Sequence, residues 1–432
     1  MTNPFRLSFA RVLPWLLLML GLASIAHAAP PVFDPVAETE ALMNTLPAEA
    51  RAKSDAYFEG GYIIQVWNFA LTLVIFWALL HFRVTVKLRD LAERCFKRRY
   101  LQGALFIGLF AVVFAVLNLP SDYYVGFIRE HRFGLSNLTT GGWLGEQVKA
   151  LLVAMIVFGL VGSLLYQGIR RAPQRWWVLA SLATPFFLLF LMVLAPVFVA
   201  PLFNTYTPLT DAKVRDPILS MARANGVPVD NVYQFDASKQ SKRVSANVSG
   251  AFHTIRVSLN DNLLNRCTPA EVQAVMAHEL GHYVLNHTYK MAIAFSLVIA
   301  AGFWFAHWFY GAVSRRCGAA WGLRGIDDLA GLPLLLAGFS VFMFLSTPVG
   351  NSIIRINEVE ADIFGLNAAR QPDGFATTAL KLAEYRKLAP GKWEEIIFFD
   401  HPSGYQRILM AMRWKAEYDP AIRMPNRESG KN

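Results

Sequence analysis

The chain has 432 residues, of which 54% are hydrophobic and only 17% are charged, and its formal net charge is +10. A soluble domain carries about 25% charged residues, and the apolar residues here form long runs, so the composition excludes an ordinary soluble protein and predicts a polytopic membrane protein. The positive charge lies in loops between those runs, where the positive-inside rule explains it. Because no basic-aromatic module is visible, we expect no nucleic-acid partner.

Residues 1–28 resemble a signal peptide. Arg6 and Arg11 precede an apolar core over 12–25, and Ala26-His-Ala28 follows as an A-x-A site with cleavage after Ala28. The alternative is an uncleaved first membrane helix. Residues 29–60 are acidic and contain prolines, and we expect them to form a helical extramembrane lead-in.

Six long apolar segments follow, each near the ~20 residues that cross a bilayer. They predict a mainly α protein, a membrane bundle of six to seven spans, with four spans in 61–203 and two in 290–350. We expect Pro185 and Pro196 to kink the fourth segment and Pro348 the sixth. The segments lie at about 61–82, 103–120, 148–168, 176–200, 290–313 and 330–350.

The loops between the segments differ in charge. Lys and Arg gather in 83–102, 169–175 and 314–329, and simple alternation places these three loops on one side of the membrane. The positive-inside rule makes that side cytoplasmic. Residues 201–289 and the tail from 351 then face the periplasm or another exterior compartment.

Residues 204–289 are expected to form a folded domain. The pattern predicts a helix over Thr210–Asn225, a strand over Val232–Phe235, and paired strands over Val244–Gly250 and His253–Leu259. A small sheet of this kind offers an edge onto which an extended peptide can add as a strand.

The strongest motif of the chain is His278-Glu279-Leu-Gly-His282. Two histidines four residues apart lie on one face of a helix and can bind one zinc ion, while Glu279 lies beside them as a general base. Thr268 and Glu271 form a T-x-x-E capping box with Pro269 after the cap, which predicts the required helix over 269–288. The alternative, a chance match on an ordinary helix, is disfavoured by this cap and by a second acidic motif downstream.

That second motif is Glu358-Val-Glu360-Ala-Asp362, in the segment 351–432 that we expect to complete the zinc site with further helices. Glu358 and Asp362 share a helix face, whereas Glu360 is turned away from it. One carboxylate as third zinc ligand, with the other holding a ligand histidine, makes a coherent site. An ordinary solvated acidic face is the alternative.

The other histidines have weaker signals. His401, in Asp400-His-Pro-Ser, is interpreted either as a group that steadies the substrate or an oxyanion or as a surface residue near a helix cap. His287 is interpreted as a support of the metal site or a structural residue. For His81, His131, His253 and His307 a structural role is expected. The three cysteines, Cys95, Cys267 and Cys317, are scattered and predict neither a disulfide framework nor a cysteine zinc site.

The chain resembles the type I CAAX prenyl proteases, a family of integral-membrane zinc metallopeptidases. The resemblance implies a helical bundle that encloses a large water-filled chamber, with a zincin-like domain at one end. It supports Glu358 as third zinc ligand and implies that Asp362 lies behind the ligands, in contact with them. It also implies that Asn247 lies on the substrate strand and that His401 and Arg355 lie near the site. The resemblance is carried by Phe127–Ser136, Ala200–Leu209, Ser245-Ala-Asn247, His278–His282, Glu358–Asp362 and His401-Pro402.

Two features depart from that family. Its members that act on prenylated proteins place the zinc domain on the cytosolic face, whereas the arginine distribution here points outward. The signal-like N-terminus also indicates a bacterial inner-membrane protein, in which prenylated substrates are not expected. We therefore expect this chain to share the fold and the reaction of the family, but not its prenylated substrates.

The sequence thus predicts a membrane-embedded zinc metalloendopeptidase with one zinc ion per chain, held by His278, His282 and Glu358, that cleaves a peptide or protein bound as an added strand. The bilayer is its expected surrounding; the oligomeric state is open, and a monomer is compatible with the sequence. Two alternatives differ in function: a quality-control protease of the heat-shock type, and a non-catalytic membrane protein with a structural zinc.

Overall fold

The computed structural model describes residues 33–250, 255–419 and 422. The predicted signal peptide or first span at 1–28 and His253 lie outside the described residues. Within them the chain is mainly α-helical with one small sheet, as predicted.

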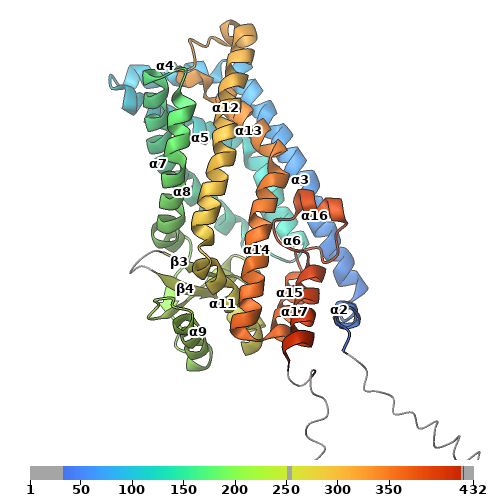
Figure 1. Ribbon diagram of the computed structural model, residues 1–432. Coiled ribbons are helices and arrows are strands. Elements are labelled where there is room, and N and C mark those ends of the chain that lie inside the picture. The colour runs from blue at the N-terminus through green and yellow to red at the C-terminus, as the bar shows by residue number, and fades with distance from the viewer. Residues whose placement is uncertain (1–32, 251–254, 420–421, 423–432) are drawn as a thin grey trace, which may run out of the picture.

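Long apolar helices form a tall bundle in which the axes of α3, α7, α8 and α12 are roughly aligned along its length (Figure 1). Five of the described helical stretches are long and apolar enough to cross a membrane, and they contain the first five predicted segments. They are Ala48–His81 (α3), Arg99–Arg132 (α5, Arg99–Tyr123, continued by a π-helical stretch, Tyr124–Arg129, and α6, Glu130–Arg132), Thr140–Arg171 (α7), Trp176–Leu202 (α8, Trp176–Leu194, with two short turns) and His287–Trp321 (α12).

The sixth predicted segment is a bent pair of helices. A short turn at Leu329–Gly331 leads into α13 (Leu332–Leu345), and α14 (Thr347–Ala369) leaves it at 56°. Pro348 lies in the first turn of α14, where a helix tolerates its missing N–H. The bend therefore falls where Pro348 was expected to kink the chain, and Pro185 and Pro196 lie inside α8 and in the π-helical turn after it.

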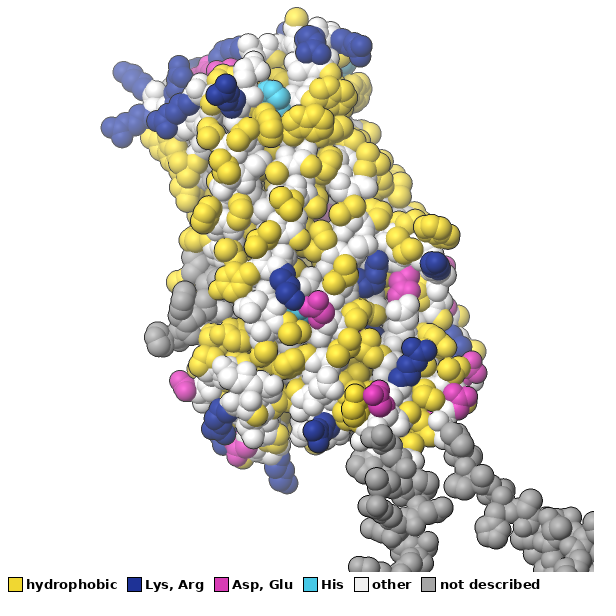
Figure 2. Space-filling model, viewed as in Figure 1, with side chains coloured by type: hydrophobic (Ala, Val, Ile, Leu, Met, Phe, Trp, Pro, Cys, Tyr) yellow, Lys and Arg dark blue, Asp and Glu magenta, His cyan; other side chains and the backbone are white. Residues whose placement is uncertain are grey.

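The middle of the bundle carries a broad apolar surface (Figure 2). Large side chains such as Ile156, Phe186 and Leu297 are 70–75% exposed on three different helices. An apolar surface this extensive is unfavourable in water and is the surface that lipid chains cover.

One end of the bundle is basic. Helix α4 (Val84–Cys95) crosses this end and is fixed to the α13 side by a buried ion pair, Arg89 Nη1 to Asp328 Oδ2 at 2.7 Å. Lys and Arg side chains gather around α4 in the space-filling view (Figure 2). The sheet and the C-terminal helices lie at the opposite end (Figure 1).

The sheet has four strands in the order β1-β2-β4-β3, with β2 parallel to β4 and the other pairs antiparallel. The three predicted strands are present, and β1 was not predicted. Strand β3 lies at the edge of the sheet, so one side of it has no strand partner among the described residues. The strands are β1 (Tyr206–Pro208), β2 (Val232–Phe235), β3 (Ala246–Ser249) and β4 (Arg256–Asn260).

One face of the sheet packs on helices to form a buried core. Ile218, Val232, Leu259, Met276 and Leu280 are all fully buried there. They fix the sheet against the predicted zinc helix. The helices beside the sheet are α9 (Ala212–Ala224), α10 (Asp261–Arg266) and α11 (Pro269–Val284).

The C-terminal helices close around α11 from the other side. Phe375 and Ile408 form a buried core with Leu366 of α14 and with Met43 of α2, which lies within the predicted lead-in. The backbone of α15 approaches α11 so closely that a Cβ at Gly374 would lie 2.7 Å from the Ala270 carbonyl. These helices are α2 (Pro35–Asn44), α15 (Pro372–Leu382), α16 (Lys392–Phe398) and α17 (Gly404–Tyr418).

Candidate metal centre

The predicted zinc helix is α11, and its start is capped as expected. The Thr268 hydroxyl accepts from the Glu271 N–H, and the Glu271 carboxylate accepts from the Thr268 N–H at 2.6 Å. The predicted end at 288 is wrong, because the helix ends at Val284 and Asn286 turns the chain in the left-handed region at φ 58°. His287 is therefore the first residue of α12.

Helix α14 crosses α11 at very short range. A Cβ at Gly365 would lie 3.0 Å from the His278 backbone nitrogen, and a Cβ at Gly281 would lie 3.3 Å from the Ala361 Cα. Small residues on both helices thus permit the close approach. It places Glu358 opposite the two histidines of α11.

Three potential ligands meet at this crossing. The Nε2 atoms of His278 and His282 lie 3.1 Å apart, and Glu358 oxygens lie 3.3 and 3.4 Å from them. One ligand atom from each of the three residues lies within 4.8 Å of the others.

The support of His278 is a buried ion pair. Its Nδ1 lies 2.8 Å from Asp362 Oδ1, and Arg407 Nη2 donates to the same oxygen at 2.5 Å. Asp362 is fully buried. Burial lowers the pKa of Arg407, but the Asp362 carboxylate outweighs it and the pKa is raised, so Arg407 stays charged.

The support of His282 runs through a second histidine. Its Nδ1 lies 2.9 Å from His287 Nδ1, and His287 Nε2 lies 3.1 Å from a Glu360 oxygen that also accepts from Lys290 at 2.6 Å. The turn at Asn286 brings His287 into this position. Glu360 does point away from the face of Glu358, as predicted, and there it contacts His287.

These contacts determine where the ring protons lie. A carboxylate only accepts, so the Asp362 contact places the His278 proton on Nδ1. The Glu360 contact places the His287 proton on Nε2, and His287 Nδ1 then accepts from His282 Nδ1. In their neutral forms, both candidate ligand histidines therefore present Nε2 lone pairs to each other and to the Glu358 carboxylate, which is the arrangement that a cation fits.

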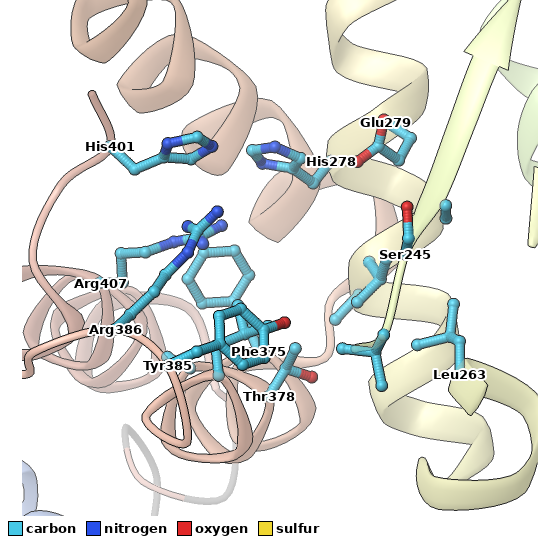
Figure 3. A pocket seen from close by; sticks show the side chains of 16 residues that line it. Ser245, Leu263, His278, Glu279, Phe375, Thr378, Tyr385, Arg386, His401 and Arg407 are labelled. Carbon is cyan, nitrogen blue, oxygen red and sulfur yellow. The ribbon is translucent and has the colours of Figure 1, made fainter. Parts of the chain in front are cut away.

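Glu279 lies on α11 beside this cluster, in the wall of a cavity that it shares with His278 and His401 (Figure 3). Burial raises the pKa of Glu279. A raised pKa suits a carboxylate that takes and returns a proton near neutral pH.

The other predicted residues differ in their distance from the cluster. His401 Nε2 lies 3.3 Å from Glu358 Oε2, and its Nδ1 lies 2.7 Å from Asp400. Asn247 is on β3 and lines a cavity with His282. Arg355 donates to the Glu395 and Phe399 carbonyls, 3.0 and 2.5 Å away, and so holds the segment that leads to His401.

The remaining histidines have ordinary partners. Trp176 Nε1 donates to His307 Nδ1 at 3.1 Å, His131 contacts the Phe127 carbonyl, and His81 stacks on Trp77. They lie away from the cluster, in agreement with the expected structural roles.

Sequence reasoning did not find Arg407, Lys290 or Arg386, a cation in the cavity wall near Glu279. Arg407 lies six residues after His401 on a helix whose packing the sequence pattern does not specify. A charged residue on a mostly apolar helix face was its one available signal.

Two cavities lie on either side of the cluster. One, of about 180 Å³, is lined by His278, Glu279 and His401; the other, of about 560 Å³, is lined by His282 and Asn247. The metal-ligand atoms therefore lie between two spaces that both border β3.

Comparison with protein families gives two adjacent matches. Residues 32–205 match the CAAX prenyl protease N-terminal model, described by five membrane helices, and residues 208–415 match peptidase family M48.

Individual relatives agree with these matches. An uncharacterized metalloprotease of Bacillus subtilis, YhfN, is 32% identical over 78% of this chain and 79% of its own length. CAAX prenyl protease 1 of Saccharomyces cerevisiae is 33% identical over 44% of this chain and 43% of its own length. The crystal structure of Saccharomyces mikatae Ste24p has the same fold, with a TM-score of 0.72, 22% identity, and coverage of 90% of this chain and 92% of that one.

Proposed function

We propose a ligand set, a catalytic base and a substrate-binding mode for this chain, which belongs to peptidase family M48, with the CAAX prenyl protease type of membrane region. It is a membrane-embedded zinc metallopeptidase. The proposal concerns which residues perform that chemistry, and on what kind of substrate.

His278, His282 and Glu358 hold one zinc ion. The observation that carries this assignment is the convergence of two imidazole nitrogens and a buried carboxylate oxygen within 4.8 Å of one another. Left without a cation, such a cluster would carry an uncompensated electrostatic cost. Zinc, when bound there, supplies a Lewis acid that polarises a peptide carbonyl and lowers the pKa of a water molecule.

Glu279 acts as the base. It takes a proton from the attacking water and returns it to the leaving amine, and its raised pKa favours both steps. The ring of His401 faces the cluster from the opposite wall (Figure 3). Because its Nδ1–H points to Asp400, it is the doubly protonated form of His401 that donates from Nε2 to the oxyanion developing on the scissile carbonyl.

The substrate is a peptide or an unfolded stretch of a protein, bound as an added strand on β3. The edge position of β3 and the two cavities that border it support this mode. Asn247, in the middle of that strand, is placed to bind the substrate near the scissile bond.

The test compares Glu279→Gln with Glu417→Gln, which makes the same chemical change at an exposed position of α17. With the full-length protein in nanodiscs, we expect Glu279→Gln to keep its zinc and to lose cleavage of an unstructured reporter peptide by at least about a thousandfold. Glu417→Gln should cleave like wild type. An active Glu279→Gln protein would refute the mechanism.

We infer a membrane orientation, which the basic end of the bundle supports. We place α4 and its neighbouring basic loops in the cytoplasm of a bacterium and the zinc site on the outer side of the inner membrane, because Lys and Arg gather at the end opposite the sheet (Figure 2).

A native cysteine tests this orientation. Cys95 is exposed at the end of α4, so an impermeant maleimide should label it in inverted membrane vesicles and not in intact spheroplasts. Labelling in spheroplasts alone would place the zinc site in the cytoplasm.

A further inference from the structure

Arg386 is a cation without a partner in the wall of the smaller cavity. Its guanidinium forms no hydrogen bond or ion pair with any residue in the described part of the chain, although its own carbonyl accepts from Ser54. Burial is the main cause of its lowered pKa, and the positive charge of Arg407 adds to it. A partly buried arginine without a partner in the protein is unfavourable, and an anion in the cavity would pair with it.

The neighbouring arginines each have a partner in the protein. Arg407 is paired with Asp362, and Arg355 binds two backbone carbonyls. Figure 3 shows Arg386 beside Arg407, with both side chains directed toward the space between His401 and His278. Of these three cations near the metal cluster, Arg386 alone forms no side-chain hydrogen bond or ion pair with a residue in the described part of the chain.

The rest of the cavity is apolar at its base. Leu263, Ala274 and Phe375 line it and are buried, and the volume of about 180 Å³ is small. Such a space suits the end of an extended segment or one or two side chains. An apolar base beside a guanidinium without a partner favours a ligand that has an apolar portion and a carboxylate, because a guanidinium binds a carboxylate through two parallel hydrogen bonds.

Strand β3 gives this cavity a direction. The residues that enter β3, Val244–Ala246, line the Arg386 cavity, and Asn247–Gly250 line the larger one. A substrate that adds antiparallel to β3 runs from the larger cavity to the smaller one, and antiparallel pairs are the more common kind. Its residues after the scissile bond then reach Arg386.

We propose that Arg386 is a specificity-determining residue that binds a carboxylate on the C-terminal side of the scissile bond, supplied by an acidic side chain or by the end of the substrate chain. This inference rests on the proposed function, since it uses the same zinc site and the same strand. It adds the chemical class of substrate that the site prefers.

The test uses a set of quenched fluorescent peptides that share one sequence before the scissile bond. After the bond they carry either Gln or Glu, and they end in either a free carboxylate or an amide. Wild type should cleave the peptides that hold a carboxylate with a kcat/KM higher by about tenfold to a hundredfold than the uncharged peptide, the range for hydrogen bonds to a charged group. Mass spectrometry of the products shows on which side of the cut the carboxylate lies.

The variants are Arg386→Gln and, as a matched control, Arg413→Gln, which removes an exposed arginine of α17. Arg386→Gln should reduce the ratio between charged and uncharged peptides to about one, Arg386→Lys should restore part of it, and Arg413→Gln should keep the wild-type ratio. Zinc content and the thermal unfolding temperature check that Arg386→Gln is folded.

The outcomes separate the two proposals. A preference for the Glu side chain alone, or for the free terminus alone, supports the inference and identifies the source of the carboxylate. Cleavage with equal kcat/KM for all peptides, or a wild-type ratio in Arg386→Gln, overturns it and leaves the catalytic proposal intact. Failure of the catalytic proposal would look different, because Glu279→Gln would then cleave the uncharged peptide like wild type.

Discussion

The two proposed ligand histidines, His278 and His282, are supported in physically different ways. His278 rests on Asp362, which has no exposed side-chain surface and is paired with a buried Arg407. His282 rests on the buried ring of His287. The partner of His287 is Glu360, which in turn pairs with Lys290, and these two side chains are 43% and 49% exposed. The chain therefore holds one histidine with a charge pair in its core and the other with a relay that ends in solvent.

This difference predicts that the two supports contribute unequally to the stability of the fold. A buried carboxylate is costly to remove, because it leaves the other charge unpaired, whereas an exposed ion pair contributes little. Each support holds the ring proton of its histidine on Nδ1, so both supports should matter for metal affinity. The support of His278 should matter more for the stability of the fold.

The largest effect should follow from Asp362→Asn. It removes the charge that orients His278 and leaves Arg407 without its ion-pair partner. We therefore expect a loss of zinc affinity of about 10–100-fold and a destabilisation of about 3–5 kcal/mol. Competition with a zinc chelator and thermal unfolding measure the two quantities. The double variant Asp362→Asn, Arg407→Leu should unfold at a higher temperature than the single one; an equal or lower temperature would show that the unpaired Arg407 is not the cause.

The His287→Leu variant tests the relay. It removes the acceptor for His282 Nδ1 while it keeps an apolar side chain in a buried position, and we expect about a tenfold loss of zinc affinity. Stability should fall less than in Asp362→Asn. If His287→Leu weakens zinc more than Asp362→Asn does, the comparison between the two supports is reversed.

The Glu360→Gln variant tests the exposed end of that relay. Because the group is partly solvated and its ion pair with Lys290 is worth at most about 1 kcal/mol, zinc affinity should fall by no more than about fivefold. Chelator competition at low and high salt measures this, and the effect should shrink as salt rises. A loss as large as that of His287→Leu would show that the carboxylate, and not the ring, controls His282.

Glu271→Gln should change stability without changing the metal site. Burial raises the pKa of Glu271, but Lys381 and the Thr268 N–H outweigh it and hold the pKa below its ordinary value of 4.5. A lowered pKa stabilises the fold above the unfolded-state pKa, and that contribution is lost as pH falls through the folded-state value. The variant should be less stable by about 1–3 kcal/mol at pH 7, and the difference should shrink below about pH 4.5. Unfolding at pH 7 and pH 4 measures it, and a difference that is constant with pH would contradict the ion pair.

Much of this arrangement could be predicted from local patterns. The apolar segments, the capped helix and the shared face of Glu358 and Asp362 each depend on spacing along one element, which the sequence displays directly. The third ligand required one further inference, that two motifs 76 residues apart meet, and the chemistry of an incomplete zinc site supplied it.

The parts that were missed depend on tertiary geometry. The end of α11 at Val284 depends on a left-handed Asn286, and periodicity does not distinguish that turn from another helical residue. Arg407 on α17, Arg386 in the segment after α15 and Lys290 on α12 acquire their positions only when these parts pack around α11. Strand β1 is only three residues long, which is too short for an alternating pattern to indicate it.

The central claim is that Glu358, and not His401, completes the metal site with His278 and His282. His401 Nε2 lies only 3.3 Å from a Glu358 oxygen, so the two side chains compete for the same place. Zinc-edge X-ray absorption on the full-length protein, with zinc content per chain, tests this most directly. We predict one zinc with two imidazole nitrogens at ~2.0–2.1 Å and a carboxylate oxygen, full zinc in His401→Ala and little in Glu358→Ala. A spectrum with three imidazoles, or full zinc in Glu358→Ala, would contradict the account.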